Sequence, residues 1–348
     1  MEDGCGRVVP HTMRVRRPFV IALALAFIVA SWVTWRRVGM PGSSHTGPLP
    51  PLSAAQRALA AELERDVVAL ATGIGVRNTA APSGLHAARA FVREELERAG
   101  YRPREEVWTA RGVECANVIA ERPGSAEVVV VGAHYDSAPE CPGANDNGSG
   151  VAALLALARR FASHPTARTL RFAAFANEEP PYFGTIDMGS ARCARGCRER
   201  GEKVVAMVSL ETLGCYSDSP DSQRYPAPGL SWLYPSTASF VAFVGDPDSA
   251  DLVRDVVGLF RANAAFPSEG AALPRGIQGV DWSDHRSFWE QGYRALMVTD
   301  TAPFRYAHYH TRADTPEKLD YERMARVVEG LEHVLAQLVH AEPRLDRD

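Results

Sequence analysis

Two apolar runs, EVVVVGA at Glu127–Ala133 and TLRFAAFA at Thr169–Ala176, constrain the fold more than any other feature of the chain. A strand with one face in water alternates apolar and polar residues, so an unbroken apolar run indicates a strand buried on both faces. Such strands are typical of parallel sheets with helices on both sides. The two runs therefore predict an α/β protein.

Helix-like and strand-like segments alternate around these runs. We expect helices at 54–70, 85–99, 151–161, 186–200, 250–263 and 321–340, and further strands at 104–109, 117–121, 203–210, 240–244 and 295–299. This alternation favours an α/β sheet covered on both faces. No break in composition divides the region, so we predict one domain at 54–341, followed by a tail at 342–348.

Residues 18–35, PFVIALALAFIVASWVTW, form an uncharged apolar run. A helix of this length, at about 1.5 Å per residue, just spans a bilayer core of about 30 Å. Basic residues flank the run and are slightly more numerous before it, which favours a cytoplasmic tail at 1–17 and an exported domain. We expect a single-pass anchor in the cytoplasmic membrane, with the domain outside the cytoplasm. A cleaved signal peptide and a secreted domain form the alternative.

Residues 36–53 connect this anchor to the domain and are rich in Gly, Pro and Ser from Gly39 onward. That composition predicts a flexible linker. The formal net charge of −4 is small for 348 residues. Nucleic-acid-binding domains usually carry clustered Lys and Arg, so we expect no nucleic-acid partner. No feature of the sequence predicts the oligomeric state.

Polar residues gather where the predicted strands end. His134 and Asp136 follow the first apolar run, Glu178 and Glu179 follow the second, and Glu211 ends a third strand. Functional groups in open α/β sheets collect at the carboxyl ends of the strands. Adjacent carboxylates in such a place are costly unless a cation or a proton offsets them.

Two further segments carry candidate ligands. GANDNGSG holds Asp146 at the entry to a helix, and YAHYHTRADT holds His308 and His310. Asp146 alone could cap the helix, and a single histidine after a strand is usually structural. Three carboxylates and two imidazoles at strand ends and helix starts together predict a two-metal site.

Five motifs in this order, GAHYDS, PGANDNGSGVAALL, FAAFANEE, SLET and YHTRADT, resemble the di-zinc exopeptidases of the bacterial leucyl aminopeptidase type. Glutamate carboxypeptidase, glutaminyl cyclase and the transferrin receptor ectodomain are relatives of that family. The resemblance covers the chain from about Leu85 onward. It implies a mixed sheet, parallel at its centre and sandwiched by helices.

The resemblance also implies a role for each residue of the predicted site. It makes His134 and Glu211 ligands of one zinc, Glu179 and His310 ligands of the other, and Asp146 the carboxylate that bridges them. Glu178 would be the general base, Asp136 the partner of His134, and Tyr309 a group that polarises the substrate carbonyl. The family often has Asp where this chain has Glu211, and often a cis peptide at Asp146–Asn147.

Charge balance favours the same assignment. Two Zn²⁺ ions would be nearly neutralised by Asp146, Glu179, Glu211 and a bridging hydroxide, and imidazole and carboxylate are ligands that zinc accepts. Asp284 and His285 could line the pocket or be structural, and Asp314 is expected to cap the turn at Thr315.

The predicted function is release of N-terminal residues from peptide substrates by a two-zinc mechanism with Glu178 as base. A carboxypeptidase is less favoured because no arginine cluster is evident for a substrate carboxylate. Two further hypotheses are a single-zinc glutaminyl cyclase and a non-catalytic binding ectodomain.

Overall fold

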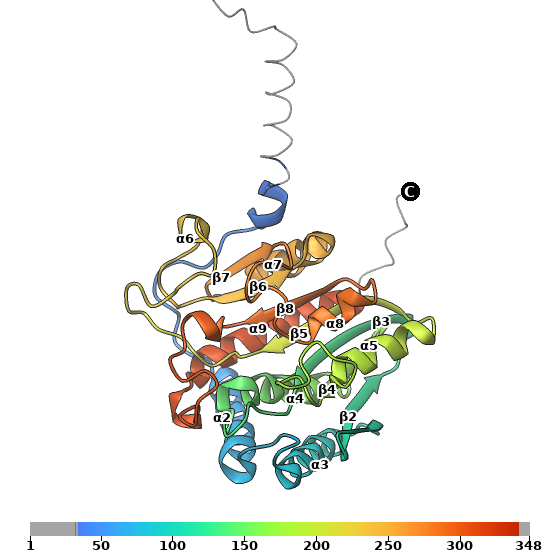
Figure 1. The fold of residues 1–348 in the computed structure, drawn as a ribbon. Coiled ribbons are helices and arrows are strands. Elements are labelled where there is room, and N and C mark those ends of the chain that lie inside the picture. Colours follow the sequence, from blue (N-terminus) through green and yellow to red (C-terminus); the bar gives the residue numbers. More distant parts are fainter. Residues whose placement is uncertain (1–31, 33, 341–348) are drawn as a thin grey trace, which may run out of the picture.

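The computed structural model describes residue 32 and residues 34–340 (Figure 1). The predicted membrane anchor at 18–35 therefore lies almost wholly outside the described residues, as do the cytoplasmic tail at 1–17 and the C-terminal tail at 342–348. Among the helices that the structure describes, none is both long enough and apolar enough to cross a membrane.

Within the described residues, an eight-stranded mixed sheet forms the centre of the molecule (Figure 1). Strands β4, β3, β5 and β8 run parallel at its centre. Antiparallel β2 and β1 extend one edge, and β6, antiparallel to β8, begins the other. In spatial order the strands are β1 (Arg104–Ala110), β2 (Val113–Arg122), β4 (Arg168–Phe175), β3 (Ser125–His134), β5 (Lys203–Glu211), β8 (Ala295–Thr299), β6 (Val241–Gly245) and β7 (Ser268–Ala272).

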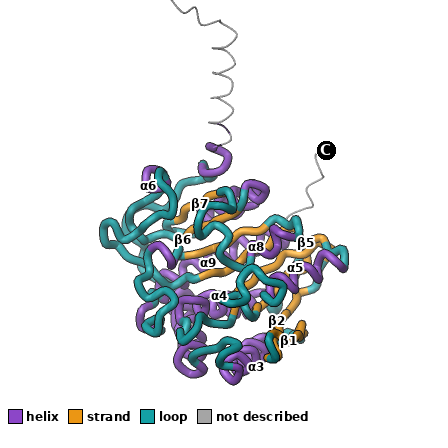
Figure 2. The backbone as a smooth tube through the Cα atoms, in the orientation of Figure 1, coloured by secondary structure: helices purple, strands orange, loops and turns teal. Residues whose placement is uncertain are grey.

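Helices lie on both sides of this sheet. One side holds α2 (Ala54–Val68), α3 (Pro82–Arg98), α4 (Gly150–Phe161), α7 (Ala250–Asn263) and α9 (Tyr321–His340). The other side holds α5 (Gly189–Glu199) and α8 (His285–Glu290). The single turn α6 (Leu230–Leu233) belongs to the long loop between β5 and β6, and loops form much of the surface in this region (Figure 2).

Alternate residues of β3 enter two separate hydrophobic cores. Val129 and Val131 pack into the core beneath α4 and α9, whereas Val128 and Val130 pack into the core beneath α5 and α8. Burial on both faces is the reason why the apolar run is unbroken. The α/β architecture and the mixed, centrally parallel sheet predicted from the sequence are confirmed.

The sequence prediction missed several short elements, including the single turn α6, strand β7 and helix α8. Strand β7 (Ser268–Ala272) and helix α8 (His285–Glu290) contain only five and six residues, too few for a clear periodicity. The predicted helix at 186–200 begins instead at Gly189, after a turn. The predicted strand at 117–121 is the inner part of β2, which also pairs with β1.

The segment expected to be a flexible linker, residues 36–53, lies against the domain in the structure. Met40 packs against the larger core. Arg261 donates to the carbonyl of Pro41 at 3.2 Å, and the backbone N–H of Ser268 donates to Ser44 Oγ at 2.9 Å. The Gly-, Pro- and Ser-rich composition predicted a flexible linker, and it gives no sign that arginines of the domain bind carbonyl groups of this segment.

Arg254 provides a test of this docking, because its guanidinium group lies 5.0 Å from the ring centroid of Trp35 and donates to the carbonyl of Gly39. Arg254→Ala should remove about 1 kcal/mol from the free energy that holds this segment against the domain. Trypsin cleavage after Arg36 and Arg37 should then accelerate about fivefold, since cleavage follows the population of the open segment. The matched control is Arg93→Ala on the exposed face of α3. Equal cleavage rates in both variants and the native chain would contradict the docking.

Candidate metal centre

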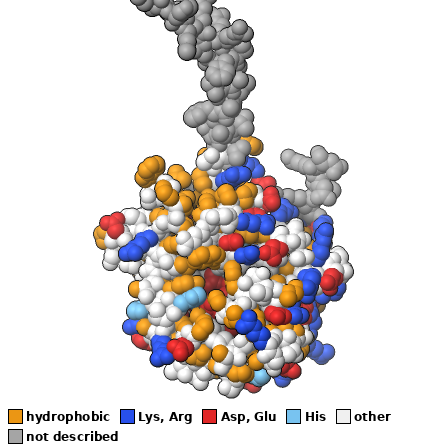
Figure 3. Space-filling view, in the orientation of Figure 1, with side chains coloured by type: hydrophobic (Ala, Val, Ile, Leu, Met, Phe, Trp, Pro, Cys, Tyr) orange, Lys and Arg blue, Asp and Glu red, His pale blue; other side chains and the backbone are white. Residues whose placement is uncertain are grey.

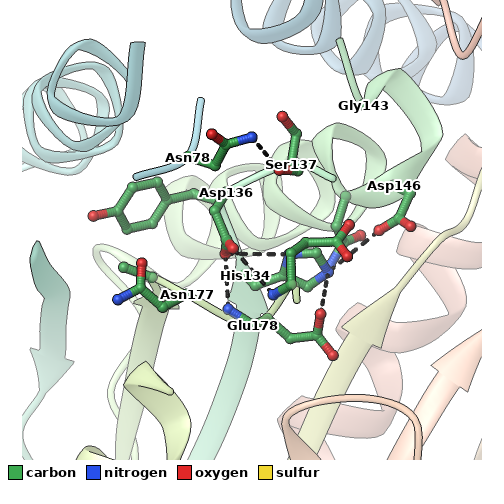
Figure 4. A network of polar contacts seen from close by, with 12 residues as sticks. Asn78, His134, Asp136, Ser137, Gly143, Asp146, Asn177 and Glu178 are labelled. Carbon is green, nitrogen blue, oxygen red and sulfur yellow. Dashed lines mark hydrogen bonds and ion pairs between the residues drawn. The ribbon is translucent and has the colours of Figure 1, made fainter. Parts of the chain in front are cut away.

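All the predicted site residues meet at the carboxyl end of the parallel strands. His134 ends β3 and Glu211 ends β5, while Glu178 and Glu179 follow β4 directly. Asp146 comes from the loop that leads into α4, and His310 from the loop after β8. Figure 4 shows His134, Asp136, Asp146 and Glu178 gathered around one point.

The carboxylate of Asp146 faces both histidine rings. Its Oδ1 lies 3.4 Å from His134 Nε2, and its Oδ2 lies 2.9 Å from His310 Nε2. His134 Nε2 is also 3.2 Å from Glu211 Oε2 and 3.8 Å from Glu178 Oε2. His310 Nε2 is 3.3 Å from Glu179 Oε2.

These side chains form two groups with the spacing of metal ligands. The ligand atoms of His134, Glu178 and Glu211 all lie within 4.8 Å of one another, and so do those of Asp146, Glu179 and His310. All except His310 are buried, and Oε1 of Glu179 has no hydrogen-bond partner. Four buried carboxylates beside two imidazoles leave excess negative charge, which a pair of divalent cations would offset. The donor set therefore fits zinc.

Burial and mutual repulsion perturb the acids of the metal-free site. Burial raises the pKa of Glu178 well above its usual value, and burial together with Asp146 raises the pKa of Glu179 to about 7. Burial opposes protonation of both histidines, but the carboxylates prevail and raise the pKa of His310 to about 10 and that of His134 well above its usual value. Without metal, these raised pKa values favour protonation of the glutamates and histidines of the site.

Asp136 positions the segment that carries the two glutamates. Its carboxylate accepts hydrogen bonds from the backbone N–H groups of Glu178 and Glu179, both at 3.1 Å. Its Oδ1 also lies 3.5 Å from Nδ1 of His134 (Figure 4). An acid in this place favours the His134 tautomer that leaves Nε2 free to bind a metal.

Asp314 holds the loop that carries Asp146. Its carboxylate accepts from the backbone N–H groups of Asn145 at 2.8 Å and Asp146 at 3.1 Å, and from the hydroxyl of Tyr306. The expectation that Asp314 caps the turn at Thr315 is therefore wrong. Short-range sequence patterns suggested the local cap, whereas the two backbone groups that Asp314 binds lie 169 and 168 residues away in the chain.

Asn147 joins the same loop to the end of β5. Its amide donates to the carbonyl of Leu210 at 2.8 Å, and its Oδ1 accepts from the backbone N–H of Thr212 at 3.0 Å. The peptide bond between Asp146 and Asn147 is cis, as the family resemblance predicted. These contacts fix Asp146 relative to Glu211.

Arg77 is a fully buried residue that sequence reasoning missed. It donates to the carbonyl of Tyr135 at 2.7 Å and to that of Gly143 at 2.6 Å. It thereby connects the end of β3 to the start of the Asp146 loop. No local pattern marks this role, because the carbonyl groups that it binds are 58 and 66 residues distant in sequence.

Tyr309 and His308 have different neighbours in the structure. Tyr309 stacks on His310, with ring centroids 3.9 Å apart. Burial and the nearby acids raise the pKa of its phenol, so the hydroxyl stays protonated and can donate. His308 instead packs edge-on against Tyr306. The preference for His310 over His308 as the ligand agrees with this geometry.

Asp284 and His285 do not lie on a pocket rim, because both are fully buried. Burial raises the pKa of Asp284 to about 7 and lowers that of His285 to about 4. His285 has a structural role, since its Nε2 donates to the carbonyl of Val280 at 2.8 Å. Ser283, immediately before them, donates to Glu211 Oε2 at 2.8 Å and orients that carboxylate.

Comparison with known proteins agrees with this geometry. Residues 117–335 match the model of peptidase family M28, which is more than half of the chain. The chain belongs to peptidase family M28. Membership confirms the family predicted from the five motifs, and with it an enzyme that performs metal-dependent hydrolysis of peptide bonds.

Individual relatives extend the comparison. The uncharacterized protein YfbL of Escherichia coli K12 is 35% identical over 279 residues, which are 78% of this chain and 85% of that one. Leucine aminopeptidase 1 of Trichophyton rubrum is 29% identical over 239 residues, covering 64% of this chain and 58% of its own length.

Among solved structures, a zinc aminopeptidase from Bacillus subtilis has a TM-score of 0.65 at 14% identity, covering 81% of this chain and 95% of its own. A glutaminyl cyclase from Fimbriiglobus ruber has a TM-score of 0.59 at 21% identity, covering 84% of this chain and 97% of its own. These structures share the fold of the chain.

The metal-free M28 chain should become less stable between pH 6 and pH 8. The folded-state pKa values of Glu179 and Asp284, about 7, exceed the ordinary values of 4.5 and 3.8. Their stabilising protonation is therefore present at low pH and lost as the pH rises through 7, at about 1 kcal/mol per group. The raised pKa values of His134 and His310 act in the same direction.

Guanidinium unfolding of the chelator-treated chain at pH 6 and pH 8 measures this change. Glu179→Gln should reduce the pH dependence, because one titrating group is removed. Zinc should stabilise the native chain more at pH 8 than at pH 6, since its ligands must be deprotonated. A metal-free chain that gains stability from pH 6 to pH 8 would contradict the assignment.

Proposed function

We propose that this M28 peptidase is a zinc aminopeptidase that uses two zinc ions and Glu178 as its general base. The observation that carries the proposal is the carboxylate of Asp146, which faces His134 with one oxygen and His310 with the other. Each histidine has its own glutamate, Glu211 beside His134 and Glu179 beside His310. This arrangement offers two three-residue ligand sets that share the carboxylate of Asp146. Glu178, which has ligand spacing to His134 and Glu211, is then assigned as the base and not as a ligand.

Zinc bound in these sets would polarise the carbonyl group of the scissile peptide bond and acidify the attacking water. Glu178 would accept the proton of that water and deliver it to the leaving amine, since its Oε2 lies 3.8 Å from His134 Nε2 and faces the same space. A raised pKa suits a base that works near neutral pH. The protonated hydroxyl of Tyr309 would donate to the carbonyl oxygen as negative charge develops on it.

An aminopeptidase is favoured over a carboxypeptidase by the charge of the site. The buried groups around the metal positions are acidic, which suits a free α-ammonium group near Glu211 and Glu178 and opposes a substrate carboxylate. The relatives named leucine aminopeptidase also support cleavage at the N-terminal end of the substrate. A non-catalytic ectodomain is disfavoured because the ligands and the base are all present.

A glutaminyl cyclase is the second candidate, because two solved glutaminyl cyclases share the fold. Such an enzyme would convert an N-terminal glutamine to pyroglutamate at a single zinc. The second ligand set of Glu179, His310 and Asp146 together with Glu211 beside His134 favours two metals instead. Release of ammonia from a Gln-peptide, without release of free amino acid, would support the cyclase.

We further propose that residues 18–35 anchor the enzyme in the cytoplasmic membrane with the catalytic domain outside the cytoplasm. The apolar length of that run and its basic flanks support this location. Secretion after cleavage of the run is the alternative. Fractionation of cells, followed by protease treatment of intact spheroplasts, separates the two locations.

Glu178→Ala should abolish hydrolysis of aminoacyl anilides by the full chain in detergent, with a fall in kcat of at least about 10²-fold, while zinc content stays unchanged. Glu199→Ala, at an exposed position of α5, is the matched control. Acetylation of the substrate α-amine should prevent turnover by the native enzyme.

Two results would count against the proposal. Turnover retained in Glu178→Ala would remove Glu178 as the base. Equal hydrolysis of the free and the acetylated substrate would show that the enzyme does not require an N-terminal amine.

A further inference from the structure

A cavity of about 830 Å³, its open mouth included, adjoins the metal centre on the α5 and α8 side of the sheet. Glu211 and Tyr309 form its near wall, so the cavity and the centre are continuous. In Figure 3, acidic side chains are visible at the bottom of a recess among hydrophobic ones. Most of the lining is apolar, from residues that include Leu230, Leu273, Ile277, Trp282 and Phe304.

Strand register shows what forms the floor of this cavity. Glu211 of β5 pairs with Thr299 of β8, Thr299 pairs with Ala242 of β6, and Ala242 pairs with Glu269 of β7. Paired residues project from the same face of a sheet. The row therefore has an acid at each end and two small side chains between them, which leaves open space above Thr299 and Ala242.

The far end of the row is polar and aromatic. Glu269 lines the cavity together with Tyr225 and Tyr234, whose ring centroids are 6.1 Å apart. Burial mainly, and the charge of Glu269 as well, raise the pKa of both phenols. The carboxylate and both rings line the same part of the molecule, since all three belong to the cavity wall. A carboxylate beside two aromatic rings is a typical environment for a cationic group.

Glu269 retains the capacity to accept hydrogen bonds. Its one charged neighbour among the described residues, Arg261, has its Nη2 3.6 Å from Glu269 Oε2, beyond hydrogen-bond length. Arg261 uses its N–H groups on Ser268, at 2.7 Å from the carbonyl, and on Pro41. Burial raises the pKa of Glu269, and the charge of Arg261 opposes that rise without occupying the lone pairs of the carboxylate.

We infer that this cavity binds the side chain of the substrate's N-terminal residue and selects a long cationic one, lysine or arginine, through Glu269. The inference rests on the proposed aminopeptidase function. The methylene groups lie over Thr299 and Ala242 between apolar walls, and the terminal cation meets Glu269, Tyr225 and Tyr234.

The distances agree with such a substrate. Three interstrand steps separate Glu211 from Glu269, which is about 14 Å across the sheet. An extended lysine side chain reaches about 6 Å from Cα to Nζ. Its hydrogen bond to Glu269 adds about 3 Å. The rest of the distance across the sheet lies between the Cα atom of the lysine and the groups at the metal centre. Leucine is too short to reach Glu269.

The test compares three aminoacyl anilides on the zinc-loaded full chain: lysine, norleucine and Nε-acetyl-lysine. Norleucine matches the lysine stem without its charge, and acetyl-lysine keeps the length but is neutral. We expect kcat/KM for the lysine substrate to exceed that for either neutral one about 10- to 100-fold, the range of a hydrogen bond to a charged group. Glu269→Gln should remove this advantage, so that the ratio of kcat/KM for lysine to that for norleucine falls to about one. Glu322→Gln, exposed on α9, should change neither value.

The outcomes separate this inference from the proposed function. Hydrolysis of norleucine or leucine substrates as fast as the lysine one, or an unchanged preference in Glu269→Gln, would overturn the inference and leave the aminopeptidase intact. No hydrolysis of any aminoacyl substrate would overturn the proposed function itself. If Glu269→Gln does not fold, the comparison of kcat/KM for the three substrates on the native chain still tests the inference.

Discussion

The contact of one buried carboxylate with two imidazoles determines much of the rest of the structure. Asp146 can face His134 and His310 only because its loop is held by Asp314, and because Asn147 binds the end of β5. Removing that carboxylate from water is costly without a compensating charge. Protons or metal ions bound at the site therefore stabilise the folded chain, and the metal ions also supply the chemistry.

The sheet serves two purposes at once. Its parallel centre brings the ends of β3, β4 and β5 to a common edge, where the ligands meet. Its continuation through β8, β6 and β7 builds a floor that extends from Glu211 to Glu269 on the same face. Among the described elements, α5 contacts β2 and α8 contacts β5 and β8. The wall over the distal strands comes mainly from loops and the single turn α6, which leaves the space for a substrate side chain.

Strong local signals made the sheet and the ligand set predictable. The run around Val128–Val131 identified a strand buried on both faces, and polar residues directly after such strands must lie at one edge. His134, Glu179 and Glu211 follow from that argument, and the motif order supplied Asp146 and His310. The structure brings these five residues together, and their individual roles as ligands remain part of the proposal.

Long-range contacts were not predictable from the sequence. Arg77 and Asp314 show no periodicity or motif, and their importance depends on backbone groups far along the chain. Glu269 lies in a strand of five residues, and only its register with Ala242 places it opposite the metal centre. The docking of Met40 and Pro41 was hidden because a Gly- and Pro-rich composition reports backbone preference but not the partners that bind it.

The number of zinc ions required for activity distinguishes a two-zinc centre from a single-zinc one. The full chain, stripped of metal, would be titrated with zinc while bound metal is counted by mass spectrometry and anilide hydrolysis is followed. With two zinc sites, activity rises to its maximum as about two zinc ions bind per chain, and His310→Ala, which lacks one ligand of the second set, loses one of them. Full activity with a single zinc ion, or binding of no zinc at all, would contradict the two-zinc centre.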